Sequence, residues 1–206
     1  MNWSIVARFS AFIVIGLVVI GSWVVDGSPN SGLLRFASTA GFALYILFLL
    51  WEYWAWRWPL VQRLPHVPRD VRGTWRGTLH SQWVDPKTGQ QIPAKTVYLV
   101  VRQSASVVSA TLLTDESRST SSLAKVSEFG GAFALHYIYF NKPSMRFEDR
   151  SRMHHGSTAL EVVACPAKRL TGRYWTDRDS RGELDFTERK VEFPDDYASA
   201  VALWES

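Results

Sequence analysis

From residue 71 onward the chain alternates apolar and polar residues with a period of two, and no other feature of the sequence constrains the fold as strongly. In the first segment, 71–83, Val71 and Trp75 share one face while Arg72 and Arg76 share the other. Alternation at this period predicts β-strands with one buried face. Eight such strands are expected, at residues 71–83, 96–103, 107–114, 119–128, 132–140, 157–165, 169–176 and 182–189.

Eight short strands at near-regular spacing predict an antiparallel meander. Closing such a sheet into a small β-barrel removes its exposed edges, and eight strands leave an interior for packed side chains or one small ligand. A β-sandwich is the alternative fold. After the last strand, Pro194 is followed by Asp195 and Asp196, a pattern that predicts a short C-terminal helix.

Two apolar runs, 5–25 and 33–51, precede the strands, and each carries one arginine near an end. Runs of about 20 apolar residues are long enough to cross a bilayer as helices. The segment between them, 26–32, is short and holds Gly, Pro and Asn, so the helices are expected to form a transmembrane hairpin. The alternative for the first run is a cleaved signal peptide.

The flanks of these runs predict the topology and the domain boundaries. Arg57, Arg63 and Arg69 follow the second run, which favours cytoplasmic termini at both ends. Three prolines then mark a stiff linker. We therefore expect a membrane-anchored all-β chain: residues 1–58 as a transmembrane hairpin with helices at about 5–25 and 33–54, 59–70 as linker, and 71–206 as a cytoplasmic, ligand-binding β-barrel with a short C-terminal helix.

Charge excludes one class of partner. Five Lys or Arg residues stand against two Asp or Glu before Asp70, and eighteen stand against seventeen from Asp70 onward. A nearly neutral β domain is not expected to bind a DNA or RNA polymer, and any phosphate must be met by a local group of arginines. The single Cys165 excludes an internal disulfide and a cysteine-based zinc site.

No catalytic motif is present in the sequence. It has no Gly-x-Ser-x-Gly elbow, no phosphate loop and no His-Glu-x-x-His motif. His154 and His155 are adjacent, and adjacent residues of a strand face opposite sides, so they are not expected to share a metal. We expect no enzyme activity, no catalytic residue, no metal and no cofactor.

Arginines mixed with aromatic residues suggest where a ligand binds. Guanidinium groups hold phosphate oxygens and flat rings stack on bases, so such mixtures suit nucleotides. The alternative is that the rings belong to the core and the arginines to the solvated face. The candidates in the segments 72–76 and 173–181 are Arg72, Trp75, Arg76, Arg173, Tyr174, Trp175, Thr176 and Arg178.

The connection 141–155 is a third candidate, because long loops in compact domains are often functional. It is rich in Arg and His and could fold over a barrel mouth, or it could be a solvated loop. Tyr137 and Tyr139 precede it on the same strand face as Phe133 and Leu135, and if that face is inward their hydroxyls point into the barrel. An anionic ligand there could meet Arg146, Arg150 or Arg152.

Taken together, these features resemble the SMODS-associating two-transmembrane β-strand-rich effectors. The resemblance spans nearly the whole chain and rests on the two apolar runs, the aromatic and Arg-rich exit from the second, and two strand motifs. The first motif is Gly73, Trp75 and Gly77; the second is Leu170, Gly172, Tyr174, Trp175, Thr176, Arg178, Ser180 and Gly182.

That resemblance implies an antiphage effector of cyclic-oligonucleotide-based antiphage signalling (CBASS) at the bacterial inner membrane. A nucleotidyltransferase of the cGAS and dinucleotide cyclase kind makes a cyclic dinucleotide; the barrel binds it, the chain forms homo-oligomers, and the lipid bilayer is disrupted. A ligand with two phosphates needs cations, for which the candidates are Arg72, Arg76, Arg152, Arg173 and Arg178. The alternatives are a lipocalin-like barrel that binds a lipid or apolar small molecule, and a tethered assembly factor.

Overall fold

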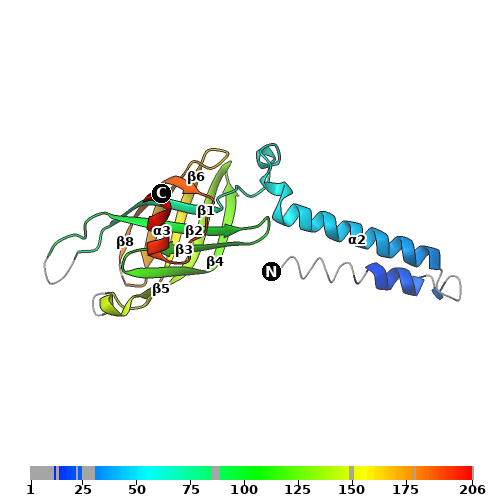
Figure 1. The fold of residues 1–206 in the computed structure, drawn as a ribbon, viewed down its shortest axis with the longest axis horizontal. Helices are drawn as coiled ribbons and strands as arrows, with labels where there is room; N and C mark the ends of the chain where they lie inside the picture. Colours follow the sequence, from blue (N-terminus) through cyan, green and yellow to red (C-terminus); the bar gives the residue numbers. More distant parts are fainter. Residues whose placement is uncertain are drawn as a thin grey trace. The chain divides into compact units, whose positions relative to one another are not determined.

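The computed structural model describes residues 12, 14–21, 23–24, 31–84, 89–148, 151–178 and 180–205. The chain divides into two compact units, Met1–Trp58 and Pro59–Ser206, and each is considered by itself. Figure 1 shows the helical first unit and the strands of the second.

The first unit contains α2, Ser31–Tyr53, and a short 3-10 turn, η1, at Ala55–Arg57. Within α2 the hydroxyls of Ser38 and Thr39 donate to the carbonyl of Arg35, at 3.0 and 2.8 Å, which satisfies these polar groups inside the helix. The predicted helix at 33–54 overlaps α2. Parts of the predicted helix at 5–25 lie outside the described residues, and those of its residues that are described are helical.

One prediction about this unit is overturned. In the described ranges no helix combines the length and the apolar character needed to cross a membrane. This finding contradicts the predicted multi-pass location in the inner membrane, and it leaves the predicted transmembrane hairpin without support.

The second unit begins with a linker that is fastened to the barrel. It contains a 3-10 turn, η2, at Val61–Arg63. The Gln62 amide donates to the Pro68 carbonyl at 3.0 Å and accepts from the Asp70 amide at 2.9 Å. Gln103, at the end of β2, donates to the Arg69 carbonyl and accepts from the Val71 amide, both at 2.9 Å. The linker is therefore held at one end of the barrel.

Eight antiparallel strands form a closed barrel, in which each strand pairs with the next and β8 pairs with β1. This confirms the predicted eight-stranded barrel and excludes the sandwich (Figure 1). The strands are β1 Gly73–Ser81, β2 Lys95–Gln103, β3 Val108–Leu113, β4 Ser117–Phe129, β5 Ala132–Pro143, β6 His154–Val163, β7 Arg169–Thr176 and β8 Arg181–Lys190.

The long connection predicted at 141–155 is shorter than expected. Asn141 pairs with His154 and Phe140 pairs with His155, so β5 and β6 both extend into it. Polar and apolar residues do not alternate at these positions, so the sequence did not predict strands there. Their backbone groups nevertheless pair with those of the neighbouring strand. Pairing with a partner strand, which a single sequence does not reveal, set these boundaries.

Alternate residues of every strand fill the barrel interior. Trp75 is fully buried there and its indole donates to the Val71 carbonyl at 2.8 Å. Arg189 lies over the Trp75 ring at 5.3 Å and forms an ion pair with Asp70 at 3.0 Å. Arg69 lies over the Phe133 ring at 4.2 Å. Side chains and the linker thus close this end of the barrel, which we call the linker end.

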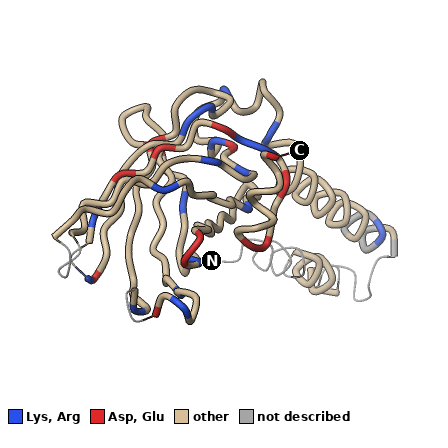
Figure 2. The backbone as a smooth tube through the Cα atoms, turned by 60° about the vertical axis from the view of Figure 1, so that its left-hand side comes forward, with Lys and Arg blue, Asp and Glu red and all other residues tan. Residues whose placement is uncertain are grey.

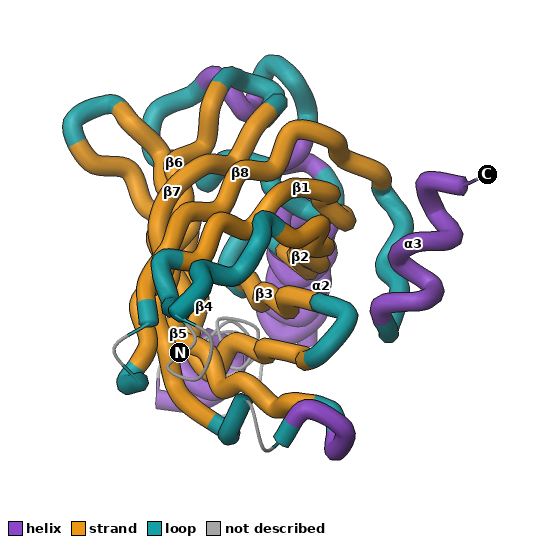
Figure 3. The backbone as a smooth tube through the Cα atoms, turned by 90° about the vertical axis from the view of Figure 1, so that its left-hand side faces the viewer, coloured by secondary structure: helices purple, strands orange, loops and turns teal. Residues whose placement is uncertain are grey.

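A short helix, α3, Tyr197–Glu205, lies against the outside of the barrel beside β2 and β3 (Figure 3). Ala200 is fully buried and packs with Tyr98, Val100 and Leu113. Asp196 begins the helix: its carboxylate accepts from the Ser199 amide at 2.8 Å, and this bond lowers the pKa of Asp196. The predicted C-terminal helix is present and begins after the expected proline.

Candidate functional site

A cavity of about 160 Å³, lined by both polar and apolar side chains, lies at the end of the barrel opposite the linker. It is formed where β1, β3, β5 and β7 end and where β2, β4, β6 and β8 begin, because consecutive strands are antiparallel. We call this end the mouth. Its lining includes many residues that carry a hydroxyl or amide group: Ser81, Thr114, Ser117, Ser119, Tyr137, Tyr139, Asn141, Ser151, Thr158, Tyr174, Thr176 and Ser180.

Three predicted tyrosines point into this cavity. Tyr137, Tyr139 and Tyr174 are 3%, 6% and 8% exposed. Two glycines make room for their rings, because a Cβ on Gly156 would lie 2.4 Å from the Tyr139 hydroxyl and one on Gly182 would lie 2.9 Å from that of Tyr174. Each glycine is the cross-strand partner of the tyrosine it accommodates.

An aromatic series runs from the interior toward the mouth. The ring centroids of Tyr137 and Tyr139 are 5.9 Å apart, and those of Tyr139 and His154 are 6.4 Å apart in an edge-to-face arrangement. His154 lies at the first position of β6, at the mouth. Flat rings along one wall provide the surfaces on which a base or sugar of a ligand can pack.

Burial keeps the tyrosine hydroxyls protonated. Burial raises the pKa of Tyr137 to about 12, an effect that the nearby Thr158 hydroxyl partly offsets. The pKa of Tyr139 is raised by burial first and then by Tyr137, Tyr174 and Asp177. The pKa of Tyr174 is also raised by burial. At neutral pH all three hydroxyls can donate a hydrogen bond to a ligand.

The cation that lines the cavity is already paired. Lys95 forms ion pairs with Glu116 at 2.6 Å and with Asp115 at 3.5 Å. Nearby neutral groups also bond with one another: Ser119 donates to the Asn141 side-chain oxygen at 2.8 Å, and the Thr176 and Ser180 hydroxyls are 2.7 Å apart. The inner cavity therefore offers hydrogen bonds rather than unpaired positive charge.

Arg178 and Arg152 lie together at the rim of the mouth. The Arg178 guanidinium donates to the Arg152 carbonyl at 3.0 Å and to the Ser151 hydroxyl at 3.4 Å. Its backbone amide donates to the Thr176 hydroxyl at 3.2 Å. The structure thus brings Arg152, Thr176 and Arg178 to the cavity that holds the three tyrosines.

The first predicted motif does not join this site. β1 starts at the linker end, so Arg72, Trp75 and Arg76 lie far along the strand from Ser81 at the mouth. Trp75 is core, the Arg72 guanidinium lies over the Phe193 ring at 5.8 Å, and Arg76 faces outward to Glu188 at 3.5 Å. The structure therefore does not bring these three predicted ligand contacts to the cavity at the mouth.

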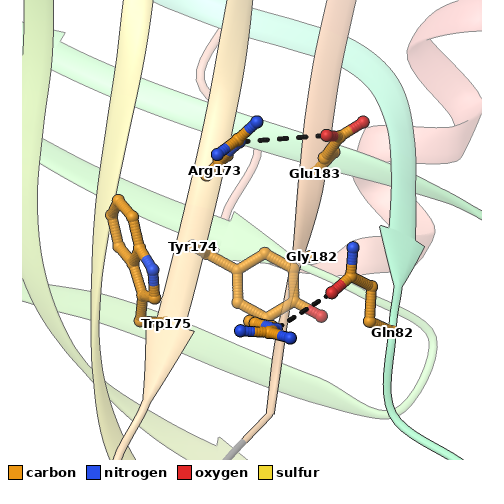
Figure 4. Close-up of a pocket in the computed structure, with 7 residues that line it drawn as sticks. Gln82, Arg173, Tyr174, Trp175, Gly182 and Glu183 are labelled. Atoms are coloured by element: carbon orange, nitrogen blue, oxygen red, sulfur yellow. Dashed lines mark hydrogen bonds and ion pairs between the residues drawn. The ribbon is translucent and has the colours of Figure 1, made fainter.

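The second motif is divided between the two faces of β7. Tyr174 and Thr176 face the cavity, while Arg173 and Trp175 face outward, as the period of two requires. Arg173 and Trp175 line an external groove of about 250 Å³ (Figure 4). In this groove Arg173 is 3.9 Å from Glu183, and Arg181 donates to Gln82 at 3.0 Å.

Sequence analysis missed several residues of the cavity. Thr158, Ser119 and Asn141 are each at most 5% exposed although polar. The signal for Thr158 was present, since it occupies an inward position of the predicted strand 157–165. No group of three or more His, Cys, Asp or Glu residues in the described ranges could hold a metal ion.

Comparison with known proteins identifies the family of this barrel. Residues 66–188 match the family described as the Cap15 cyclic dinucleotide receptor domain. This match begins in the linker and ends in β8, so it covers the mouth and its cavity. The chain is also 30% identical over 134 residues to CD-NTase-associated protein 15 of Staphylococcus schleiferi. The aligned region covers 65% of this chain and 68% of that protein. The chain belongs to the Cap15 cyclic dinucleotide receptor family.

Proposed function

We propose that this chain binds a cyclic dinucleotide at the mouth of its barrel, as an effector of CBASS antiphage signalling. The family match covers the strands that form the mouth, and this observation carries the proposal. The related protein is named for its association with a CD-NTase, so the ligand of this chain is expected to come from such a nucleotidyltransferase. A receptor role requires binding and no chemical step.

The mouth offers the two kinds of group that a cyclic dinucleotide needs. Tyr139 and Tyr174 provide aromatic walls for bases, and the Arg178 guanidinium, which contacts the Arg152 backbone, provides a cation for a phosphate at the rim. In the described residues the Arg178 guanidinium bonds to a carbonyl and a hydroxyl, both neutral, so its charge is available to an anion.

The charges of the whole barrel agree with a local phosphate site. Figure 2 shows Lys and Arg interspersed with Asp and Glu along the strands. Attraction of a dinucleotide must then come from a few arginines at the site itself. The Arg178 guanidinium at the rim is one such group.

A lipocalin-like role is less well supported by the cavity. An apolar ligand would leave the Tyr137 and Thr158 hydroxyls without a partner, and an unsatisfied buried hydroxyl costs about 1–3 kcal/mol. The nucleotide interpretation predicts arginines facing inward or at the rim, and Arg178 lies at the rim. A tethered assembly factor would need no cavity at the mouth.

Binding is proposed to promote assembly of several copies of the chain. A ligand shifts an assembly equilibrium only by binding the assembled form more tightly than the separate one. The rim lies at the barrel surface, where a bound ligand can also touch a neighbouring copy. The prediction that the chain disrupts the inner membrane depended on its predicted location in that membrane, which the structure contradicts. The proposed function therefore includes ligand-dependent assembly and does not include membrane disruption.

Equilibrium dialysis of the full chain against radiolabelled cyclic dinucleotides, with bases A, G and U in all combinations, tests the proposal. At least one should bind saturably, and Arg178→Ala should weaken that binding about tenfold to a hundredfold, because a hydrogen bond to a charged group is lost. Arg173→Ala removes an arginine of the same strand region that faces outward, and it should change affinity less than twofold.

Sedimentation velocity on the same samples measures assembly. The mass of the wild-type chain should rise when the bound dinucleotide is added and should not rise for Arg178→Ala at the same ligand concentration. Absence of saturable binding by every dinucleotide tested contradicts the proposed function. Binding without any change in mass contradicts its assembly part alone.

A further inference from the structure

Two buried hydroxyls in the cavity have no hydrogen-bond partner. Tyr137 and Thr158 are each 3% exposed, and although the Thr158 hydroxyl is near enough to affect the pKa of Tyr137, in the described part of the chain neither the Tyr137 Oη nor the Thr158 Oγ1 meets the geometry of a hydrogen bond. The two residues are cross-strand partners on β5 and β6, and both line the cavity. Buried polar atoms of folded proteins are nearly always paired, so this pair calls for a partner from outside the chain.

The size of the cavity restricts what that partner can be. A cavity of about 150 Å³ in another protein holds benzene, whereas sites for drug-sized ligands measure about 300–1,000 Å³. The cavity of this barrel measures about 160 Å³. It therefore accepts one ring-sized group and cannot enclose two bases and two phosphates.

The charges in the cavity decide which part of a dinucleotide enters. Lys95 is neutralised by Glu116 and Asp115, and most of the other polar groups in the described lining are hydroxyls and amides, with the His154 imidazole at the mouth. A phosphate taken into this space would lose its hydration with no unpaired cation to replace it. A neutral heterocycle with donors and acceptors on its edge would lose much less.

We propose that one base of the ligand enters the barrel and that the hydroxyls of Tyr137 and Thr158 bind its hydrogen-bonding edge, while the phosphates and the second base stay at the rim. This inference rests on the proposed function and deepens it. The aromatic series of Tyr137, Tyr139 and His154 provides the wall along which the base enters. Tyr137 and Thr158 are thus residues that determine specificity.

Removing either hydroxyl is expected to weaken dinucleotide binding without lowering the stability of the fold. Removing an unpaired buried hydroxyl does not destabilise the unliganded fold, because no bond within the protein is lost. Tyr137→Phe and Thr158→Val should therefore unfold at the wild-type temperature or above it. Each should weaken the best dinucleotide about tenfold, since the base would meet an apolar group in place of a partner.

Matched controls come from the outer wall. Tyr98 and Thr111 are buried, at 3% and 8% exposed, on the face of β2 and β3 away from the cavity. Tyr98→Phe and Thr111→Val make the same chemical changes and should leave affinity within twofold of the wild type. Dialysis of the full chain against the radiolabelled dinucleotides, with thermal unfolding of the same samples, gives both readouts.

The outcomes separate the two proposals. A tenfold loss of affinity with unchanged or raised stability, restricted to the two cavity variants, supports base insertion. Wild-type affinity in both cavity variants overturns base insertion and leaves the proposed function in place. A fall in stability of both variants also overturns it, because the hydroxyls would then be bonded within the protein. No dinucleotide binding by the wild type overturns both proposals.

Discussion

At the scale of single residues, neighbours along β7 have unrelated roles. Tyr174 is 8% exposed and faces the cavity, whereas Trp175 is 46% exposed and faces the external groove (Figure 4). A motif read as a continuous string therefore mixes residues of two surfaces. The inward positions, Tyr174 and Thr176, line the cavity, and the outward-facing Arg173 does not.

The raised pKa of Tyr137 predicts how stability depends on pH. The folded state binds the Tyr137 proton until about pH 12, while an unfolded tyrosine releases it near pH 10. The free energy of unfolding should therefore be unaffected by this group below pH 10 and should fall by about 3 kcal/mol between pH 10 and 12. Urea denaturation of wild type and Tyr137→Phe at several pH values measures this difference.

The variant provides the comparison for that prediction. Tyr137→Phe cannot ionise at this position, so its stability should fall less steeply above pH 10 than that of the wild type. Parallel curves for the two proteins would show that Tyr137 titrates as it does in the unfolded chain. The buried location of its hydroxyl in the cavity would then be wrong.

At the scale of elements, cross-strand pairs of tyrosine and glycine shape the mouth. A Cβ on Gly156 of β6 would lie 2.4 Å from the Tyr139 ring and 2.6 Å from the Trp175 carbonyl. Contacts this short are not tolerated, so either the ring or the strand must move. The glycine thus fixes the position of Tyr139 in the cavity without touching the ligand itself.

Gly156→Ala should weaken dinucleotide binding at least tenfold and lower the free energy of unfolding by about 1–3 kcal/mol. The physical reason is displacement of Tyr139 and of the backbone between β6 and β7. Ser157→Ala, at the next and outward-facing position of β6, should change neither quantity. If Gly156→Ala, like Ser157→Ala, changes neither dinucleotide affinity nor the free energy of unfolding, then β6 tolerates a Cβ at Gly156. This glycine would then have no part in shaping the mouth.

The strands were predictable from the sequence, and their assembly into a site was not. The period of two predicted eight strands, and inward positions for Tyr137 and Tyr139 followed from it. The register was not available, and only the register pairs Tyr137 with Thr158 and Tyr139 with Gly156. The motif at Arg72 lies at the start of β1, at the end of the barrel opposite the mouth. The sequence did not predict this separation, because a single sequence does not show which strand ends lie together.

At the scale of the whole molecule, the barrel has one closed end and one polar end. Trp75, Arg189 and the linker fill the linker end, where Gln62 and Gln103 fasten the chain. The mouth carries the cavity, the three tyrosines and the rim arginines. A ligand is therefore expected to enter from the mouth. The N-terminal unit was predicted less well, because apolar runs in a sequence do not by themselves establish a membrane span.

The account depends most on where the dinucleotide lies, and a crystal structure of the full chain with its best-binding cyclic dinucleotide shows this directly. We predict one base between Tyr139 and Tyr174, within hydrogen-bonding distance of the Tyr137 and Thr158 hydroxyls, and a phosphate on Arg178. A dinucleotide bound in the external groove of Arg173 and Trp175, with the cavity unoccupied, would contradict the account.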